Sequence, residues 1–423
     1  MIPFSFVHTA DLHLGTPFQG ISGAGEALGR KLTTATYQAF ENIVSYSLEN
    51  KVDFMLVAGD IFDSTDRSLY AQLAFLKSLK RLDQAGIAVY IAHGNHDPLD
   101  GWSAALDWPG NTHIFGGKAV EREVFCKDGQ ATAEILGISF PRRDITNNLA
   151  ILFPAPTAGL FSIGLLHCNV GVTGYENYAP CGLQDLLASG LDYWALGHVH
   201  TRACLHESGP LVAYPGNPQG LHAKETGARG FLHVVVDEDG DASSRFIPCD
   251  SVRWTQIALL IDGITRDEDL QKAQKQALDR IRQESGERPT ICRLALEGRG
   301  PLHANLARAN YIRDMLQNCR EVEEQEEAFV WLEEIEDRTR PSLDRSALLA
   351  QGDFTGELLR LIDDTVAGEE GWTELNEALR PVYQEARLCK LLEPLDGESL
   401  KEICGLAETL CLDRLLQGAG DAD

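Results

Sequence analysis

Short apolar runs alternate with amphipathic segments along the first part of the chain. Runs of strand length fall at residues 4–9, 52–58 and 87–92, whereas apolar residues recur at helical spacing over 30–50 and 68–84. An alternation of this kind predicts an α/β layered domain.

The region that follows is richer in predicted strands. They fall at residues 163–166, 193–196, 211–214 and 231–236, with few helices between them. A sandwich of two sheets flanked by helices accommodates both styles. We therefore predict this architecture for residues 1–250.

The pattern changes near residue 250. Beyond it, three predicted strands alternate with two predicted helices, at residues 255–261, 268–283, 291–296, 304–318 and 328–335. This order predicts a small β-α-β-α-β module of the α+β kind over residues 251–340. Residues 341–423 are predicted to be mostly helical, with one apolar stripe formed by Leu400, Ile403, Ala407 and Leu410.

Acidic residues outnumber basic residues by 63 to 37, which gives a formal net charge of −26. This charge argues against a protein that coats nucleic acid or an anionic membrane through a general basic field. It leaves room for a local site that captures phosphate with metal ions, because bound cations invert the local field.

The cellular location is also suggested by the sequence. The first ten residues lack the features of a secretory signal, and no apolar run approaches the length of a membrane span. Ten cysteines without a CxxC pair are typical of reduced thiols. We therefore expect a cytoplasmic protein with no membrane segment.

Candidate metal ligands follow the predicted strands. Five short segments carry them: Thr9-Ala10-Asp11-Leu12-His13, Gly59-Asp60-Ile61-Phe62-Asp63, Gly94-Asn95-His96-Asp97, His167, and Gly197-His198-Val199-His200. Because the carboxyl ends of strands in an α/β sheet face the crevice where ligands bind, we expect these side chains to converge. Side chains two residues apart in extended chain point the same way, which lets each DxH or HxH pair act together.

The donor set indicates two metal ions. Two carboxylates, one amide oxygen and four imidazoles exceed what one tetrahedral zinc ion needs. They suit two divalent ions that share a carboxylate. Mixed carboxylate, amide and imidazole ligands favour manganese, iron or zinc over calcium, which prefers oxygen alone.

The order DxH, GDxxD, GNHD, H, GHxH resembles the calcineurin-like metallophosphoesterase superfamily. The strings HTADLHLG, VAGDIFD and HGNHD are similar to those of the SbcD-like DNA-repair nucleases. Residues 192–230, with DYWALGHVH and AYPGNPQGLHAKETGARG, most resemble the YhaO-type branch of that family. The resemblance implies a metallophosphoesterase β-sandwich flanked by helices, then a small α+β capping module and a helical C-terminal region.

The resemblance also implies roles for the residues. One metal ion would be held by Asp11, His13, Asp60 and His200, and the other by Asp60, Asn95, His167 and His198, with Asp60 as the bridge. His96 matches the catalytic histidine of the family, and Asp63 the carboxylate that orients it. Manganese is the metal that the resemblance favours, with iron or zinc as alternatives.

The implied function is a phosphodiesterase that acts on DNA ends as the nuclease subunit of an SbcCD-like complex. The capping module would recognise DNA, and the C-terminal region would dock onto an SMC-like coiled-coil ATPase. Two other functions stay open: a phosphoesterase for a small nucleotide or phosphodiester, and a non-catalytic scaffold subunit. Formation of a homodimer is left open as well.

Some polar residues allow two interpretations. The basic residues of the predicted helix 268–283 either contact a nucleic-acid backbone or belong to a solvated face of mixed charge. The loop 214–220 is either a rigid connector or a functional loop that lines the phosphate site or contacts a partner, in which case His222 and Arg229 are candidate substrate contacts.

Overall fold

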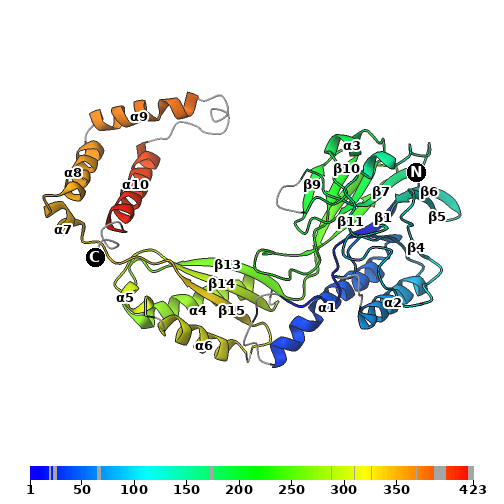
Figure 1. Cartoon of the computed structure of the whole chain (residues 1–423), viewed down its shortest axis with the longest axis horizontal. Helices are drawn as coiled ribbons and strands as arrows, with labels where there is room; N and C mark the ends of the chain where they lie inside the picture. The colour runs from blue at the N-terminus through cyan, green and yellow to red at the C-terminus, as the bar shows by residue number, and fades with distance from the viewer. Residues whose placement is uncertain are drawn as a thin grey trace. The chain divides into compact units, whose positions relative to one another are not determined.

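A computed structural model describes residues 1–18, 21, 26–63, 68–171, 176–286, 288–308, 310–324, 326–367, 369–384 and 397–417. The chain forms two compact units, Met1–Arg340 and Pro341–Asp423. Figure 1 shows the elements of both units in chain order.

The first sheet of the sandwich has a parallel centre and an antiparallel edge. Its strands, in spatial order, are β12 (Ala242–Pro248), β11 (Gly230–Val236), β1 (Phe4–Thr9), β2 (Phe54–Ala58), β3 (Ala88–Ala92) and β4 (Thr112–Ile114). Strands β1 to β4 run parallel, β11 pairs antiparallel with β1, and β12 pairs antiparallel with β11 at the edge of the sheet. The parallel run brings the carboxyl ends of β1, β2 and β3 to one edge.

The second sheet has a similar parallel centre. Its strands, in spatial order, are β5 (Glu121–Lys127), β6 (Gln130–Gly137), β7 (Phe161–His167), β8 (Tyr193–Gly197), β10 (Leu211–Tyr214) and β9 (Ala203–His206). Strands β6, β7, β8 and β10 run parallel, so that β7 and β8 end together. Both sheets thus deliver strand ends to one site.

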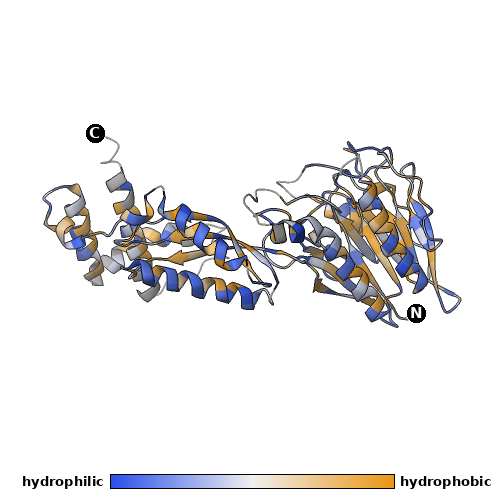
Figure 2. Ribbon diagram, turned by 90° about the horizontal axis from the view of Figure 1, so that it is seen from below, coloured by the Kyte–Doolittle hydropathy of each residue, from blue (hydrophilic) through white to orange (hydrophobic). Residues whose placement is uncertain are grey.

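Period-two packing explains why the central strands are apolar on both sides. In β2, Phe54 and Leu56 face the other sheet, whereas Met55 and Val57 face the helices α1 (Glu26–Asn50) and α2 (Leu69–Gln84). The outer face of the second sheet is covered in the same way by the 3₁₀ turn η1 (Ala150–Leu152) and α3 (Leu183–Leu187). Figure 2 shows the apolar residues concentrated in the strands between these helices.

The small module follows the sandwich. Parallel strands β13 (Arg253–Leu260), β14 (Thr290–Glu297) and β15 (Val330–Asp337) form its sheet, and α4 (Asp267–Glu284), α5 (His303–Leu306) and α6 (Tyr311–Glu323) form its connections. The single helix predicted over residues 304–318 is wrong, because two helices occupy this segment. Leu302 and Leu306 pack into the module core, and the chain then turns before α6 begins.

The C-terminal unit contains α7 (Arg345–Ala350), α8 (Phe354–Ala367), α9 (Glu369–Gln384) and α10 (Gly397–Gln417). Leu348, Leu359 and Leu412 form its core, and Arg345 pairs with Glu408. The predicted stripe on α10 is on the solvent side: Ile403, Ala407 and Leu410 are exposed, while the side chain of Leu400 lies outside the described residues. Among the helices that the structure describes, none is both long and apolar enough to cross a membrane.

Candidate metal centre

The predicted site residues meet at the strand ends of the two sheets. His13 and His200 approach through their Nε2 atoms at 3.1 Å, and His167 lies 3.0 Å from Asn95 and 3.3 Å from Asp60. The remaining predicted residues adjoin these five through contacts described below: Asp11, Asp63, His96 and His198. The structure therefore brings together all nine residues that the sequence predicts.

Backbone hydrogen bonds join the two loops that carry the aspartates. The amide of Asp11 donates to the carbonyl of Gly59 at 3.0 Å, and that of His13 to the carbonyl of Asp60 at 3.0 Å. Four site residues have left-handed backbone, with φ of 52° at Asp11, 44° at His13, 50° at Asp60 and 99° at His198. Left-handed φ is uncommon outside glycine and clusters at functional sites, where the surroundings hold it in place.

Three glycines make room for the buried histidine at the centre. A Cβ on Gly59 would lie 2.3 Å from His167 Nδ1, and a Cβ on Gly197 would lie 1.8 Å from the carbonyl oxygen of Ala58. A Cβ on Gly94 would lie 2.3 Å from Asp60 Oδ1 and 2.8 Å from the ring of His167. The glycines before Asp60, Asn95 and His198 are therefore required by close packing.

The first group of acceptor atoms surrounds His167. Its Nδ1 donates to the carbonyl of Ala58 at 2.9 Å, which leaves the Nε2 lone pair pointing at Asn95 Oδ1 and Asp60 Oδ2. Three acceptors in contact repel one another unless a cation or a proton lies between them. In the metal-free protein, burial lowers the pKa of His167, but the charge of Asp60 outweighs burial and raises this pKa to about 9.

The second group lies around His13 and His200. Asp63 Oδ1 accepts from His13 Nδ1 at 3.1 Å, and Glu225 Oε1 accepts from His200 Nδ1 at 2.6 Å. These bonds put both ring protons on the outer nitrogens, so the two Nε2 lone pairs face each other at 3.1 Å. Two imidazoles about 2.1 Å from one ion have nitrogens about 3 Å apart when they bind at right angles.

The chemistry of these atoms fits divalent cations. Asp11 has a carboxylate oxygen within 4.8 Å of ligand atoms in both groups, those of His13 and His200 and those of Asp60 and His167. Its oxygens also accept from the amide of His198 at 3.1 Å and 3.2 Å. Buried lone pairs of oxygen and imidazole nitrogen, turned toward one another, are the donor set that such ions require.

His198 meets the site from the other side. Its ring lies 5.3 Å from that of His167, and its Nε2 donates to the carbonyl of Glu176 at 2.8 Å. Burial and the neighbouring His167 lower the pKa of His198, which keeps the ring neutral. Its other nitrogen, Nδ1, is then the atom that could bind a metal ion.

His96 occupies the more open part of the site. Its Nδ1 lies 3.3 Å from Asp63 Oδ1 and 3.2 Å from the Asp63 carbonyl, and its side chain is 34% exposed. The hydrogen bond to Asp63 raises the pKa of His96 to about 9 in the metal-free protein, against the effect of burial. A protonated imidazole thus stands beside the buried acceptor groups.

Two carboxylates with structural importance were not singled out from the sequence. Asp97 is fully buried and accepts from the amides of Gly94 at 2.8 Å and Ile61 at 2.9 Å, which ties two motif loops together. Its place in GNHD could have indicated this role. Glu225 lies in a loop 25 residues after His200, and no spacing rule points to it.

Arg229 and His222, the candidate substrate contacts next to the loop 214–220, differ in their surroundings. Arg229 is buried and donates to the carbonyl of His200 at 2.5 Å and to Asn217 Oδ1 at 3.0 Å. It therefore braces the loop behind His200. His222 is partly exposed and lies 3.5 Å from Glu225.

Substitution of Gly94 by alanine should disrupt the metal centre. The new methyl group must displace Asp60 or His167, and we expect Mn²⁺ affinity to fall by at least about 10-fold, as for other changes that misplace ligands. Isothermal titration calorimetry of the two proteins measures the effect. Gly110→Ala is the matched control, since a Cβ there meets nothing within 4 Å. Equal affinities for the Gly94 variant and the wild type would contradict this account.

The pKa of His96 should be directly measurable in metal-free protein. Its folded pKa of about 9 exceeds the ordinary value of 6.5, so the stability it contributes is present below about pH 6.5 and lost as the pH rises through 9. NMR titration of the ring should give this value in EDTA. Asp63→Asn should lower it toward 6.5. Asp239→Asn, in the turn between β11 and β12, should leave it unchanged, and a wild-type pKa near 6.5 would refute the prediction.

Two parts of the chain match known families. Residues 4–202 match the family described as calcineurin-like phosphoesterase, and this match contains all nine predicted site residues. Residues 254–340 match the family described as metallophosphoesterase YhaO, middle domain. The second match coincides with the three-stranded module.

Whole-chain comparisons agree with these matches. The chain is 36% identical to the uncharacterized metallophosphoesterase YhaO of Bacillus subtilis, over 94% of this chain and 95% of that protein. It is 26% identical to the SbcD component of the SbcCD nuclease of Escherichia coli K12, over 56% of this chain and 66% of that protein. It is 24% identical to the DNA double-strand break repair protein Mre11 of Aeropyrum pernix, over 56% of this chain and 58% of that protein.

The last two relatives extend well beyond the shared region, since the chain spans about three fifths to two thirds of their length. The similarity to the Bacillus subtilis protein, in contrast, runs through the sandwich, the module and the C-terminal unit. Together with the acceptor groups at the strand ends, it shows that the chain is a metallophosphoesterase of the calcineurin-like superfamily and belongs to the YhaO family.

Proposed function

We propose that this metallophosphoesterase is a phosphodiesterase that cleaves DNA at its ends. The observation that carries the proposal is the pair of acceptor groups, one around His167 and one around His13 and His200, with His96 at their open side, 3.3 Å from Asp63. Such a site can hold two cations and a phosphate next to a proton donor.

The nine residues divide into two ligand sets and a catalytic pair. We propose that Asp11, His13, Asp60 and His200 hold one divalent ion, and that Asp60, Asn95, His167 and His198 hold the other. Their mixed oxygen and imidazole atoms suit manganese, with iron or zinc as alternatives. Asp60 lies near both sets, because its Oδ2 is 3.3 Å from His167 Nε2 and its charge also helps to raise the pKa of His200.

His96 and Asp63 supply the proton chemistry of the proposal. Bound divalent ions would lower the pKa of a water nucleophile and offset the charge of the phosphate. The His96 ring would donate its Nε2 proton to a phosphate oxygen or to the leaving alkoxide, while its Nδ1 proton stays with Asp63. This bond fixes the orientation of the ring, and the partial exposure of His96 leaves space for a phosphodiester.

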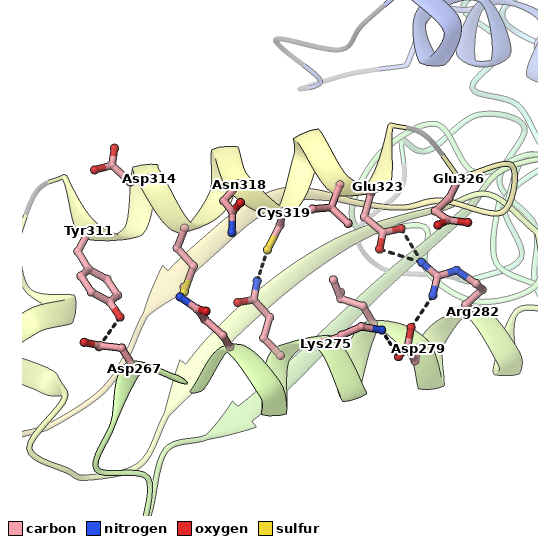
Figure 3. A pocket seen from close by; sticks show the side chains of 15 residues that line it. Asp267, Lys275, Asp279, Arg282, Tyr311, Asp314, Asn318, Cys319, Glu323 and Glu326 are labelled. Carbon is pink, nitrogen blue, oxygen red and sulfur yellow. Dashed lines mark hydrogen bonds and ion pairs between the residues drawn. The ribbon is translucent and has the colours of Figure 1, made fainter. Parts of the chain in front are cut away.

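DNA is favoured as substrate by the relatives named as part of a nuclease and as a double-strand break repair protein, although their identities are 26% and 24%. A phosphodiester of small size is the second candidate, because two of the four basic residues of α4 are paired with carboxylates. Figure 3 shows Arg282 held by Glu323 and Asp279, and Lys275 by Asp279. These residues line a cavity of about 640 Å³ between α4 and α6. Cations that are already paired with carboxylates attract the phosphates of a DNA backbone only weakly.

A partner protein would strengthen the binding of DNA. We propose that an SMC-like coiled-coil ATPase docks on the exposed apolar face of α10, made by Ile403, Leu406 and Leu410, which are 43%, 65% and 59% exposed. Their spacing of three to four residues suits packing against another helix.

A cytoplasmic location would accommodate this DNA complex and the buried, free thiols of Cys168 and Cys181.

Cleavage of linear and hairpin DNA with Mn²⁺ tests the catalytic proposal. We expect Asp60→Ala to abolish cleavage through loss of the shared ligand, and His96→Ala to slow it about 10²–10⁴-fold through loss of the proton donor. Asp239→Ala, in the turn between β11 and β12, is the control that keeps full activity. Undiminished cleavage by both site variants would refute the proposal. Hydrolysis of cyclic nucleotides or a bis-aryl phosphate with DNA left intact would favour the small substrate.

The partner can be tested by co-purification from the source organism. We expect the tagged protein to retain a coiled-coil ATPase, identified by mass spectrometry, and Leu406→Asp to lose it, because a charge would enter the apolar contact. Leu260→Asp is the matched control, since Leu260 is 62% exposed on β13, outside the C-terminal unit. Equal retention of the ATPase by the Leu406 variant would exclude this docking surface.

A further inference from the structure

A buried carboxylate outside the predicted ligand sets is bonded to the metal centre. Glu225 is 5% exposed, and its Oε1 accepts the Nδ1 proton of His200 at 2.6 Å. Its other oxygen accepts from the amide of Leu221 at 2.7 Å. Both oxygens are therefore used, and the carboxylate is held in one orientation.

This bond decides which nitrogen of His200 faces the site. With the proton on Nδ1, the Nε2 lone pair is turned toward His13 Nε2, 3.1 Å away. Asp63 does the same for His13 from the opposite side, at 3.1 Å. The two carboxylates thus bracket the histidine pair and aim both lone pairs at one point between them.

The loop that carries Glu225 is anchored on its far side by the small module. The amide of Gly227 donates to the carbonyl of Trp254 at 2.9 Å, and Gln256 Nε2 donates to the carbonyl of Ala223 at 2.8 Å. Both partners lie on β13. At the other end of the loop, a Cβ on Gly220 would lie 2.7 Å from the Glu225 carbonyl, so the chain is tightly folded there.

We propose that Glu225 is a positioning residue for the metal ion that His13 and His200 hold. It acts through His200, by fixing the ring orientation and the site of its proton, and it does not touch the ion or the substrate. This proposal rests on the proposed function only in assuming that the histidine pair binds a divalent ion. Loss of a carboxylate that orients a metal-binding histidine lowers metal affinity about 10–100-fold.

Mn²⁺ binding to the full-length protein tests the proposal. We expect the wild type to hold two ions in equilibrium dialysis, with an EPR signal of two coupled Mn²⁺ ions. Glu225→Ala should weaken one of the two ions about 10–100-fold and remove the coupled signal. The Mn²⁺ affinity of Glu225→Gln should lie between those of the wild type and Glu225→Ala. Its side-chain amide oxygen can accept from only one of the two donors, His200 Nδ1 and the amide of Leu221.

Two further measurements separate positioning from folding. Glu207→Gln is the matched control, since Glu207 is exposed in the turn after β9, and it should bind both ions as the wild type does. Thermal unfolding in EDTA reports any loss of the fold. If Glu225→Ala is unfolded, Mn²⁺ binding by Glu225→Gln tests the positioning role instead. Wild-type affinity for both ions and an intact coupled signal in Glu225→Gln and Glu225→Ala would overturn the proposal.

The outcome is independent of the substrate. If the protein binds two ions and Glu225→Ala loses one, the positioning role stands even when DNA is not cleaved, and only the proposed substrate fails. If the wild type cleaves DNA and the Glu225 variants bind both ions unchanged, the proposed function stands and the positioning role fails.

Discussion

The end of the sandwich that carries the site is shaped by one constraint: acceptor atoms that repel one another, unless a proton or a cation lies between them, must be held in contact. His13 and His200 turn lone pairs toward each other, and His167 faces the oxygens of Asp60 and Asn95. In water these groups would be solvated separately, so the fold must supply what keeps them together. A cation placed between them turns the repulsion into attraction.

Several features of the chain follow from this constraint. The parallel centres of the two sheets bring five strand ends to one edge, and the left-handed backbone at Asp11 and Asp60 turns their side chains inward. The buried carboxylate of Asp97 bonds two of the loops that would otherwise separate. The apolar layer between the sheets, with Phe6 and Phe54 stacked 4.9 Å apart, supplies the rigid base.

The sequence predicted the centre of this arrangement better than its periphery. The strands β1, β2, β3, β7 and β8 and the nine site residues could be recognised because these apolar runs end directly in chemically distinctive motifs, and the structure brings all nine together, while their roles stay predictions. The edge strands β5 and β12 were missed, since they are half exposed and mix polar with apolar residues, and the largely buried β6 was missed because no site motif follows its apolar run. The break between α5 and α6 was missed because apolar spacing continues across it. Glu225 escaped detection since its relation to His200 exists only in the folded chain.

The contact between β13 and the loop of Glu225 bears on how the parts of the chain can vary in evolution. A domain that merely capped the site could be exchanged among relatives without disturbing the chemistry beneath it. Here Trp254 and Gln256 hold the loop whose carboxylate orients His200, so the module contributes to the scaffold of the metal centre. A chimaera that joins this sandwich to a foreign module would therefore have to preserve the two hydrogen bonds between β13 and residues 223–227 to keep His200 aligned.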